Sequence, residues 1–548
     1  MTWVRDDLPR QERGGCAAVE LLPARASFRP GEEITIELRG AGGAGRITVF
    51  HLGDPVLSRD ASGTHVSLGS LPPGGYGVEL VDGERVVART AVDVREDPVA
   101  RLRYGFVVDF AAGRDVSAVL DSVRRLHLTG IQFYDWAYRH AALLEGGDEY
   151  VDPLGRPVSL ATVRALVDGM HSVGAAALGY AAVYAVGADE WPAWRHRALL
   201  DAAGEPFALG DFLRLVDPAA PDWLAHLTAE LTAAAKALGF DGFHLDQYGY
   251  PRLATRPDGT VVDVAESFVT LLRGARQRLP DSRLVFNNVN DFPTWRTAGE
   301  SQDAVYVEVW PPQVTLGSLA AVSTRAKTQA AGKPVVIAAY QHVYSEAPSA
   351  EADAATALTM ATLFSHGASH LLAGEAGRIL VDPYYVRNHV VAGSTADLLR
   401  RWYDFAVEHD ELLFDPAIVD VTAAYAGEYN DECDVHLDRS ATESPTPGAV
   451  WRRITRVGRA LVVHLINLSD QTDVRWDAPH VPPRPLHGGR IRVRRVGAAL
   501  PRIQVADPDG GSRLVDLSVR ADGTHAIADL PPLHTWQLIL LDQIGSAT

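Results

Sequence analysis

The sequence is poor in cysteine. Only Cys16 and Cys433 occur among 548 residues. Two cysteines so far apart define neither a disulfide framework nor the spacing of a metal-ligand cluster, so we interpret both as structurally incidental. We expect no metal site and no cofactor.

Basic residues and long apolar runs are also scarce. The formal net charge of −18 argues against a nucleic-acid partner, because binding phosphates requires a basic face. No run of about 18 apolar residues occurs, so we expect no membrane partner. The N-terminal segment 1–15 contains acidic residues and no apolar core, unlike a signal peptide. As given, the sequence predicts a soluble, monomeric, cytoplasmic protein, although a secreted protein whose export signal had been removed would look the same.

The overall composition is that of a globular protein with several domains. Apolar residues make up 47% and charged residues 22% of the chain, and 548 residues exceed what one hydrophobic core holds. Short alternating segments separated by Gly, Pro and Asp turns predict an N-terminal immunoglobulin-like β-sandwich over residues 1–100. Similar segments near the end of the chain predict a C-terminal antiparallel β-sandwich over residues 415–548.

Between these sandwiches, in residues 101–414, candidate strands alternate with segments of helical periodicity. Eight such units predict a central (β/α)8 TIM barrel. A doubly wound open sheet is the alternative, but no G-x-G-x-x-G motif follows the first strand. The candidate barrel strands are residues 104–110, 130–134, 175–182, 240–246, 283–288, 304–309, 334–340 and 369–374.

Polar and aromatic residues gather at the ends of these strands, where a barrel of this kind carries its chemistry. Aromatic rings, amides and carboxylates with little cationic charge suit a neutral, polyhydroxylated substrate. A phosphosugar enzyme would show a Gly-rich phosphate loop late in the barrel, and a metal-dependent hydrolase would show an H-x-H motif on the first strand. The sequence has neither. The candidate substrate-binding residues are Tyr134, Asp135, Trp136, His140, His244, Asn288, Tyr306, Trp310, Gln341 and Glu375.

Asp246 and Glu308 are the candidate catalytic pair, because cleavage of a glycosidic bond requires two carboxyl groups flanking it. If residues 240–246 form a strand, Phe240, His244 and Asp246 share the inner face and Asp241 lies on the other. Glu308 lies among aromatic residues, which suits a proton donor, whereas polar neighbours would keep Asp246 ionised as nucleophile. The alternative interpretation of Asp246 is a helix cap or a turn.

Three long motifs carry a resemblance to a known family. They are QFYDW-x-YRH at 132–140, GFDGFHLDQYG at 239–249 and YVEVW at 306–310. With these motifs and its order of domains, the chain resembles glycoside hydrolase family 66, the dextranases and cycloisomaltooligosaccharide glucanotransferases. The resemblance implies that Asp246 is the nucleophile and Glu308 the acid/base of a retaining, endo-acting enzyme for the α-1,6-linkages of dextran or isomaltooligosaccharides.

Two alternatives to hydrolysis stay open. Cyclising members of the family carry a carbohydrate-binding insertion late in the barrel, whereas residues 340–369 leave room only for a loop and a helix, which favours a hydrolase. A transglycosylase would keep the fold and replace water by a sugar acceptor. A non-catalytic glucan-binding protein would use the aromatic rim without turnover.

Overall fold

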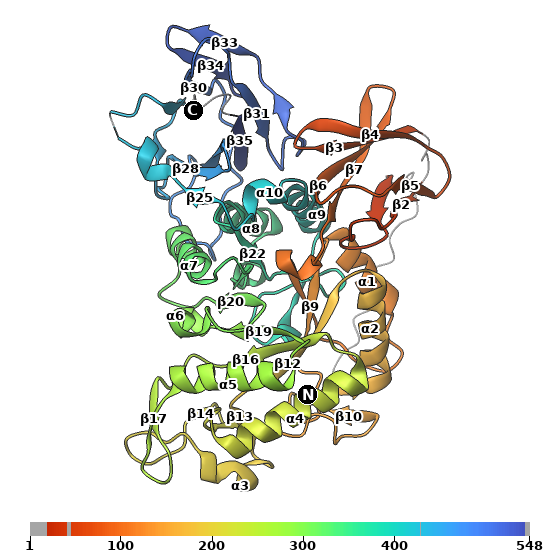
Figure 1. Ribbon diagram of the computed structural model, residues 1–548, viewed down its shortest axis with the longest axis vertical. Helices are drawn as coiled ribbons and strands as arrows, with labels where there is room; N and C mark the ends of the chain where they lie inside the picture. The colour runs from red at the N-terminus through yellow and green to blue at the C-terminus, as the bar shows by residue number, and fades with distance from the viewer. Residues whose placement is uncertain (1–18, 41–44, 428, 543–548) are drawn as a thin grey trace.

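The core of the protein is a barrel of eight parallel strands, seen in a computed structural model that describes residues 19–40, 45–427 and 429–542 (Figure 1). Each strand pairs with the next one of the barrel along the chain, and beyond β22 the amide of Phe106 donates to the carbonyl of Ala373 at 3.3 Å. The (β/α)8 barrel is therefore confirmed. Its strands are β8 (Tyr104–Val107), β9 (Gly130–Phe133), β12 (Ala176–Ala182), β16 (Gly242–Asp246), β19 (Arg283–Asn287), β20 (Ala304–Glu308), β21 (Val335–Ala338) and β22 (Ala368–His370).

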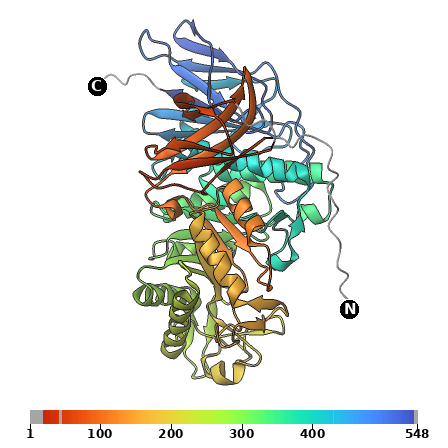
Figure 2. The ribbon, with the colours of Figure 1, turned by 90° about the vertical axis from the view of Figure 1, so that its right-hand side faces the viewer.

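Helices connect the strands and cover the outside of the barrel (Figures 1 and 2). Helix α4 ends at Leu238 and is capped by Gly239, whose φ of 80° lies in the left-handed region that glycine adopts readily. Among residues 339–367, all of them described, lie only a 3-10 turn, η4 (His342–Ser345), and α8. The helices are α1 (Val116–Arg125), α2 (Leu160–Ser172), α3 (Trp191–Trp194), α4 (Pro221–Leu238), α5 (Val264–Arg278), α6 (Thr294–Thr297), α7 (Leu316–Gln329), α8 (Ser349–Ser365), α9 (Gly393–Glu408) and α10 (Asp410–Leu413).

Three short β-hairpins and one three-stranded sheet follow barrel strands at their C-terminal ends. The first follows β9, the second β12, the third β16 and the fourth β22. Figure 1 shows β10, β13, β14 and β17 together at the end of the molecule farthest from the large sheets. The strands are β10 (Glu149–Val151) with β11 (Pro157–Ser159), β13 (Ala185–Gly187) with β14 (Ala208–Leu209) and β15 (Leu213–Leu215), β17 (Leu253–Thr255) with β18 (Val261–Asp263), and β23 (Arg378–Ile379) with β24 (His389–Val390).

The N-terminal region contains two antiparallel sheets that enclose their own hydrophobic core. Helix α9 packs against β6 and β7, and the buried Arg103 donates two hydrogen bonds to the buried Asp93 at 3.0 and 3.2 Å. These contacts fix the sheets to the barrel. The strands are β1 (Glu20–Pro23), β2 (Ile34–Arg39) and β5 (His65–Gly69) in one sheet, and β4 (Asp54–Ala61), β3 (Gly45–His51), β6 (Gly74–Asp82) and β7 (Arg85–Val94) in the other. Cys16 lies outside the described residues.

The C-terminal region also forms two sheets, mainly antiparallel, which enclose a core of their own, and the larger sheet shares a second core with the barrel. Trp536 is fully buried and stacks on Trp402 of α9 at 5.8 Å between ring centroids. Cys433 is buried and free. The sheets comprise β25 (Val419–Asp420), β28 (Val450–Val457), β29 (Ala460–Asn467), β35 (Trp536–Asp542), β31 (Arg502–Ala506), β32 (Val515–Asp516) and β27 (Ala441–Thr442), and separately β26 (Cys433–His436), β30 (Arg490–Arg494), β34 (His525–Asp529) and β33 (Val519–Asp522).

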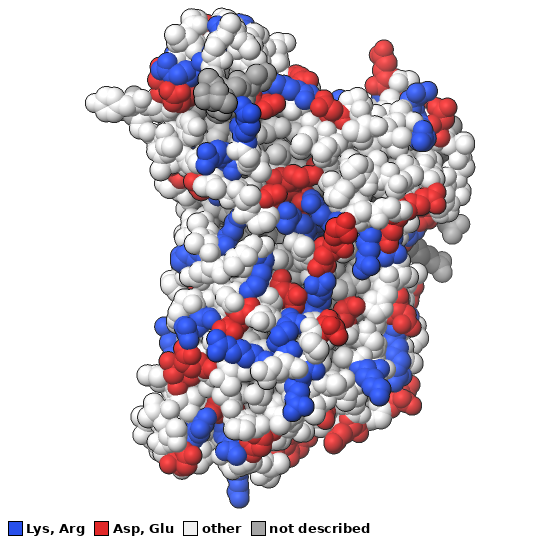
Figure 3. All heavy atoms as spheres, viewed as in Figure 1, with Lys and Arg blue, Asp and Glu red and all other residues white. Residues whose placement is uncertain are grey.

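The two terminal regions meet each other at one end of the molecule (Figures 1 and 2). Arg502 of β31 donates to Asp54 of β4 at 2.6 and 3.0 Å. Arg490, Arg492 and Arg494, which alternate along β30, pair with acidic side chains of their own sheet region. Figure 3 shows basic and acidic side chains interspersed over the visible face. No helix within the described part of the chain is long and apolar enough to cross a membrane.

Candidate active site

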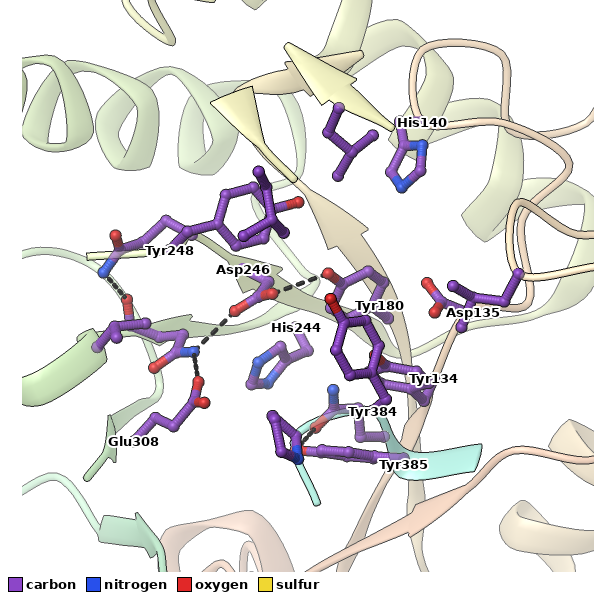
Figure 4. A pocket seen from close by; sticks show the side chains of 18 of the residues that line it. Tyr134, Asp135, His140, Tyr180, His244, Asp246, Tyr248, Glu308, Tyr384 and Tyr385 are labelled. Carbon is purple, nitrogen blue, oxygen red and sulfur yellow. Dashed lines mark hydrogen bonds between the residues drawn. The ribbon is translucent and has the colours of Figure 1, made fainter. Parts of the chain in front are cut away.

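A cavity of about 290 Å³ opens at the C-terminal ends of the barrel strands (Figure 4). Side chains at or next to the ends of β9, β12, β16, β19 and β20 line it, together with loops that fold over the rim. Since alternate residues of a strand point to the same side, His244 and Asp246 of β16 both face the interior, as predicted. Phe240 does not, because β16 begins only at Gly242. Its ring packs outside the barrel, 5.0 Å from that of Trp136.

The candidate catalytic carboxyl groups, those of Asp246 and Glu308, are joined by one amide. Asn287 Nδ2 donates to Asp246 Oδ1 and to Glu308 Oε2, both at 2.7 Å. These two oxygens therefore lie no more than twice 2.7 Å apart, about 5.4 Å. The other oxygen of Asp246 accepts from the Tyr180 hydroxyl at 2.8 Å, and that of Glu308 from the Trp310 indole at 2.8 Å. All four oxygens of the pair are held by uncharged donors.

Burial raises the pKa of both carboxyl groups. The pKa of Asp246 rises to about 6, with the hydrogen bonds from Asn287 and Tyr180 acting in the opposite direction. That of Glu308 rises to about 7, first through burial and then through the negative charge of Asp246. The sequence predicts ionised Asp246 and protonated Glu308. The higher pKa of Glu308 agrees with this expectation, but Asp246 lies in a less polar environment than the sequence suggests.

The floor of the cavity is an aromatic cluster around His244. The imidazole is 1% exposed, and burial lowers its pKa to about 3. Its ring centroid lies 4.7 Å from that of Tyr306 and 5.9 Å from that of Tyr104, whose hydroxyl is 3.3 Å from His244 Nδ1. A neutral imidazole packed in this way can shape the cavity below Asp246 but brings no positive charge to it.

Tyrosines form one wall of the cavity and a tryptophan stands at its edge. Tyr134 stacks on Tyr385 at 4.3 Å and lies 5.1 Å from Tyr180, between ring centroids. Trp310 is 36% exposed, and its ring lies 6.1 Å from that of Tyr340. Flat rings at these positions offer faces against which the C–H bonds of a sugar can pack.

Asp135 places a third carboxyl group in the cavity (Figure 4). Its φ of 50° lies in the left-handed region, which aspartate adopts more readily than most residues. Burial and the charge of Asp152 raise its pKa to about 7. His140 lines the same side of the cavity, and burial lowers its pKa to about 4. This side of the cavity can therefore exchange hydrogen bonds with a neutral ligand.

Two of the predicted substrate-binding residues, Trp136 and Asn288, lie outside the cavity. Trp136 is fully buried behind the barrel wall, and its indole donates to the carbonyl of Tyr180 at 3.1 Å. The left-handed turn at Asp135 breaks the strand alternation and sends the next side chain outward. Asn288 is buried and donates to the carbonyls of Phe286 and Tyr306, so its neighbour Asn287 takes the place at the carboxyl groups.

Gln341 and Glu375 are also corrections to the predicted site. Gln341 is fully buried and bonded to the Ala339 carbonyl and the Thr356 hydroxyl. Glu375 forms an ion pair with Arg114 and accepts from the amide of Val108 at 3.1 Å. Both side chains have their hydrogen-bonding groups occupied by the protein, and Glu375 links the loop after β22 to the end of β8.

Several residues that line the cavity are not predicted from the sequence. Asn287 was overlooked because the Asn287-Asn288 pair gives no signal for which of the two points inward. Strand alternation could have found Tyr180 on β12 and Tyr340 after β21. Tyr384 and Tyr385 belong to a loop beyond the last strand that folds back over the rim, and no local pattern marks it. Within the described residues, no group of three or more His, Cys, Asp or Glu side chains is arranged to hold a metal ion.

Comparisons with known proteins show the family of this chain. The model of glycosyl hydrolase family 66 matches residues 23–540, and the chain belongs to this family. The chain is 25% identical over 424 residues to a cycloisomaltooligosaccharide glucanotransferase of Niallia circulans, covering 69% of this chain and 43% of that protein. It is 25% identical over 403 residues to a dextranase of Streptococcus salivarius, covering 61% and 49% respectively. The matches thus span less than half the length of these relatives.

A solved structure has the same fold. The cycloisomaltooligosaccharide glucanotransferase of Paenibacillus sp., in complex with cycloisomaltoheptaose, superposes with a TM-score of 0.84 at 18% sequence identity. The superposition covers 95% of this chain and 100% of that one. The arrangement of a barrel between β-sheet regions is therefore the architecture of that enzyme too.

Proposed function

We propose that this protein is a retaining, endo-acting glycoside hydrolase that cleaves α-1,6-glucosidic linkages of dextran or isomaltooligosaccharides. The observation that carries the proposal is the sharing of one Asn287 amide by Asp246 and Glu308, which limits the separation of their bonded oxygens to about 5.4 Å. Retaining glycosidases keep their carboxyl groups about 5 to 5.5 Å apart, whereas inverting enzymes need roughly 6.5 to 9.5 Å to admit a water molecule.

The pKa values support the assignment of roles. In the first step ionised Asp246 attacks the anomeric carbon, the glycosidic C–O bond breaks, and the leaving oxygen takes the proton of Glu308. In the second step water attacks the same carbon and gives a proton to Glu308, and the bond to Asp246 breaks. Glu308, with the higher pKa, holds a proton at a pH where Asp246 has lost its own.

The setting of the pair favours a neutral sugar as substrate. Tyrosine rings and Trp310 offer apolar faces, and Asp135 and His140 offer polar groups for hydroxyls. The names of the relatives, a dextranase and glucanotransferases that form cyclic isomaltooligosaccharides, support an α-1,6-linked glucan. The preferred length of the glucan would depend on how many of its glucose units lie outside the cavity.

Transglycosylation is a second candidate outcome, favoured by the fold that the chain shares with a glucanotransferase. It differs only in the second step, where a sugar hydroxyl replaces water. The short segment between β21 and β22, which holds η4 and α8, supports hydrolysis instead, as it carries no inserted domain.

Incubation with dextran, pullulan, starch and isomaltooligosaccharides, followed by product sizing, tests the proposal. We expect internal cleavage of dextran to short linear isomaltooligosaccharides, with no cleavage of starch. Proton NMR of the first products should show the α-anomer. A first product in the β-configuration would refute Asp246 as a nucleophile, and a predominance of cyclic or lengthened products would assign the chain to the transferases. Binding of dextran without any cleavage would identify a non-catalytic glucan-binding protein.

Chemical rescue tests the nucleophile separately. In Asp246→Ala, added azide can attack the anomeric carbon from the vacated side while Glu308 still protonates the leaving oxygen. We expect a β-glucosyl azide product from this variant and none from the wild type. Failure of azide to restore any cleavage in a folded Asp246→Ala protein would argue against the assigned role.

A further inference from the structure

A second cavity, of about 250 Å³, lies at the base of the barrel. Residues at the starts of three strands line it: Ala176 of β12, Asp241 just before β16, and Arg283 of β19. Asp241 and Asp246 are five residues apart along one strand, which corresponds to about 16 Å. The basal cavity is therefore distinct from the cavity that holds Asp246 and Glu308.

The opposite wall of the basal cavity is the segment 24–29, which joins β1 to β2. The amide of Ala26 donates to the carbonyl of Val173 at 2.8 Å, and the amide of Phe28 to that of Asp93 at 3.0 Å. Gly174 has a φ of 77°, and a Cβ atom there would lie only 2.9 Å from the carbonyl oxygen of Ser27. The segment is thus fixed to the barrel on one side of Ser27 and to β7 on the other, so the cavity wall is formed before any ligand binds.

Two polar groups of this wall have no hydrogen-bond partner in the described part of the chain. Ser27 is 1% exposed and its hydroxyl is unpartnered, as is Nε of Arg25. The one hydrogen bond found for the Arg25 guanidinium runs to the carbonyl of Ser172 at 3.5 Å. Buried polar groups left without a partner destabilise a fold, so their presence beside a cavity indicates a ligand that accepts hydrogen bonds.

The charges around the basal cavity leave a positive surplus. Arg283 pairs with Asp97 at 2.8 Å and His171 with Asp241 at 2.8 Å. The closest carboxylate oxygen to Arg25 belongs to Glu32 and is 3.8 Å away, and within the described residues Arg29 forms no ion pair. Within the described residues, Arg29 therefore has no carboxylate partner and Arg25 has only Glu32 at 3.8 Å, in a protein whose formal net charge is −18.

We propose that the basal cavity binds a small oxyanion, a phosphate or carboxylate group on a molecule up to the size of a monosaccharide. Guanidinium groups bind such anions with paired hydrogen bonds, and the Ser27 hydroxyl adds a third donor. Among the described residues, no phenylalanine, tyrosine or tryptophan lines this cavity, whereas several such rings line the catalytic one. The basal cavity is thus suited to an anion and the catalytic cavity to a neutral sugar.

Isothermal titration calorimetry on the full chain at low ionic strength tests this proposal. The probes are inorganic phosphate, glucose 6-phosphate and gluconate, with glucose as a neutral ligand that reports binding of a sugar ring in the catalytic cavity. We expect saturable binding of a phosphate or carboxylate probe that glucose does not show. The phosphate and gluconate titrations distinguish the two anionic groups. The absence of saturable binding by all three anions would overturn the proposal.

Two variants locate the anion. Arg29→Ala removes an exposed guanidinium that forms no ion pair within the described residues, and Ser27→Ala removes only the unpartnered hydroxyl, so both proteins should fold. We expect each to bind the anion at least about tenfold more weakly, because hydrogen bonds to charged groups are lost. Arg59→Ala, which removes an exposed arginine from β4, is the matched control and should bind like the wild type. Equal affinity of the wild type and both site variants would place the anion elsewhere and refute the site.

Discussion

Strand β16 begins directly after one aspartate, Asp241, and ends with another, Asp246, and the two differ in the donors that surround them. Asp241, at the base, accepts from His171 and from the amide of Ala177. Asp246, at the rim, accepts from an amide side chain and a phenol within a cavity. Nearby at the base, Asp93 is held by the guanidinium of Arg103. Asp93 and Asp241 are thus held by a guanidinium, a histidine or a backbone amide, whereas Asp246 and Glu308 are held by neutral side chains.

This difference has a chemical consequence. A guanidinium would hold a carboxylate ionised and weaken it as a nucleophile or proton donor. Neutral donors fix the geometry of Asp246 and Glu308 and leave burial to raise both pKa values into the range where protons exchange near neutral pH. The four predictions that follow test this contrast between the two ends of the barrel.

The largest effect is expected from removing a rim carboxyl group. Asp246→Ala and Glu308→Gln should each lower kcat on dextran by at least about three orders of magnitude, because each deletes one half of the pair. Circular dichroism should show a folded protein in both cases. Asp109→Asn is the matched control: Asp109 is an exposed carboxylate beyond the end of β8 that does not line the cavity, and turnover should stay within a few-fold. Near-normal turnover of either rim variant would contradict the assignment.

At the base of the barrel, removing a charged side chain should lower the free energy of unfolding and leave turnover unchanged. Arg103→Met removes the guanidinium that bonds both oxygens of the buried Asp93 and leaves only Arg95, 3.9 Å away, as a cationic partner. We therefore expect about 3 to 5 kcal/mol less free energy of unfolding. Chemical denaturation and turnover at 25 °C measure the two properties separately. A large fall in kcat of the folded variant, with unchanged stability, would remove the contrast between base and rim.

Substitutions at the adjacent Asn287 and Asn288 should separate effects on turnover from effects on stability. Asn287→Ala frees both carboxyl groups from their shared donor, and we expect kcat to fall about 100-fold with a small change in melting temperature. Asn288→Ala deletes buried hydrogen bonds to the Phe286 and Tyr306 carbonyls, so it should lose about 1 to 3 kcal/mol of stability and keep most of its turnover. The reverse result would show that Asn288, not Asn287, serves the site.

The smallest effect concerns pH. The kcat/KM profile should fall below about pH 6 as Asp246 gains a proton, and above about pH 7 as Glu308 loses its proton. The indole of Trp310 donates to Glu308 and lowers its pKa, so Trp310→Phe should move the alkaline limb to higher pH by less than about one unit. Trp295→Phe, at an exposed tryptophan of α6, is the control and should leave the profile unchanged. An alkaline limb that moves downward in Trp310→Phe would contradict the role of the indole.

Much of the fold could be predicted from local patterns. The barrel strands are short, mainly apolar runs of three to seven residues bounded by turn or helix signals, and all eight predicted ranges overlap observed strands. The alternation along β16 was sufficient to place His244 and Asp246 together. It failed at Phe240, because alternation holds only within a strand, and that residue precedes it.

The candidate site was harder to predict where the backbone leaves regular structure. Tyr134 and Asp135 line the cavity as expected, but the left-handed conformation of Asp135 turns Trp136 outward. Glu375 was expected to face the substrate and is instead neutralised by Arg114, far away in sequence. Periodicity carries no information about such turns or about partners brought together only by folding.

The sequence by itself determined the barrel and the strand ends that carry Asp246 and Glu308, because these follow from short-range periodicity and parallel strand order. The catalytic role of the two carboxyl groups stays a prediction. Only the tertiary structure decided that Asn287 joins Asp246 to Glu308, that Tyr385 closes the cavity from a distant loop, and that a cationic cavity lies at the base. These features depend on the side-chain packing of segments remote in sequence. Their distances and burial, which set the pKa values and the hydrogen bonds, exist only in the folded chain.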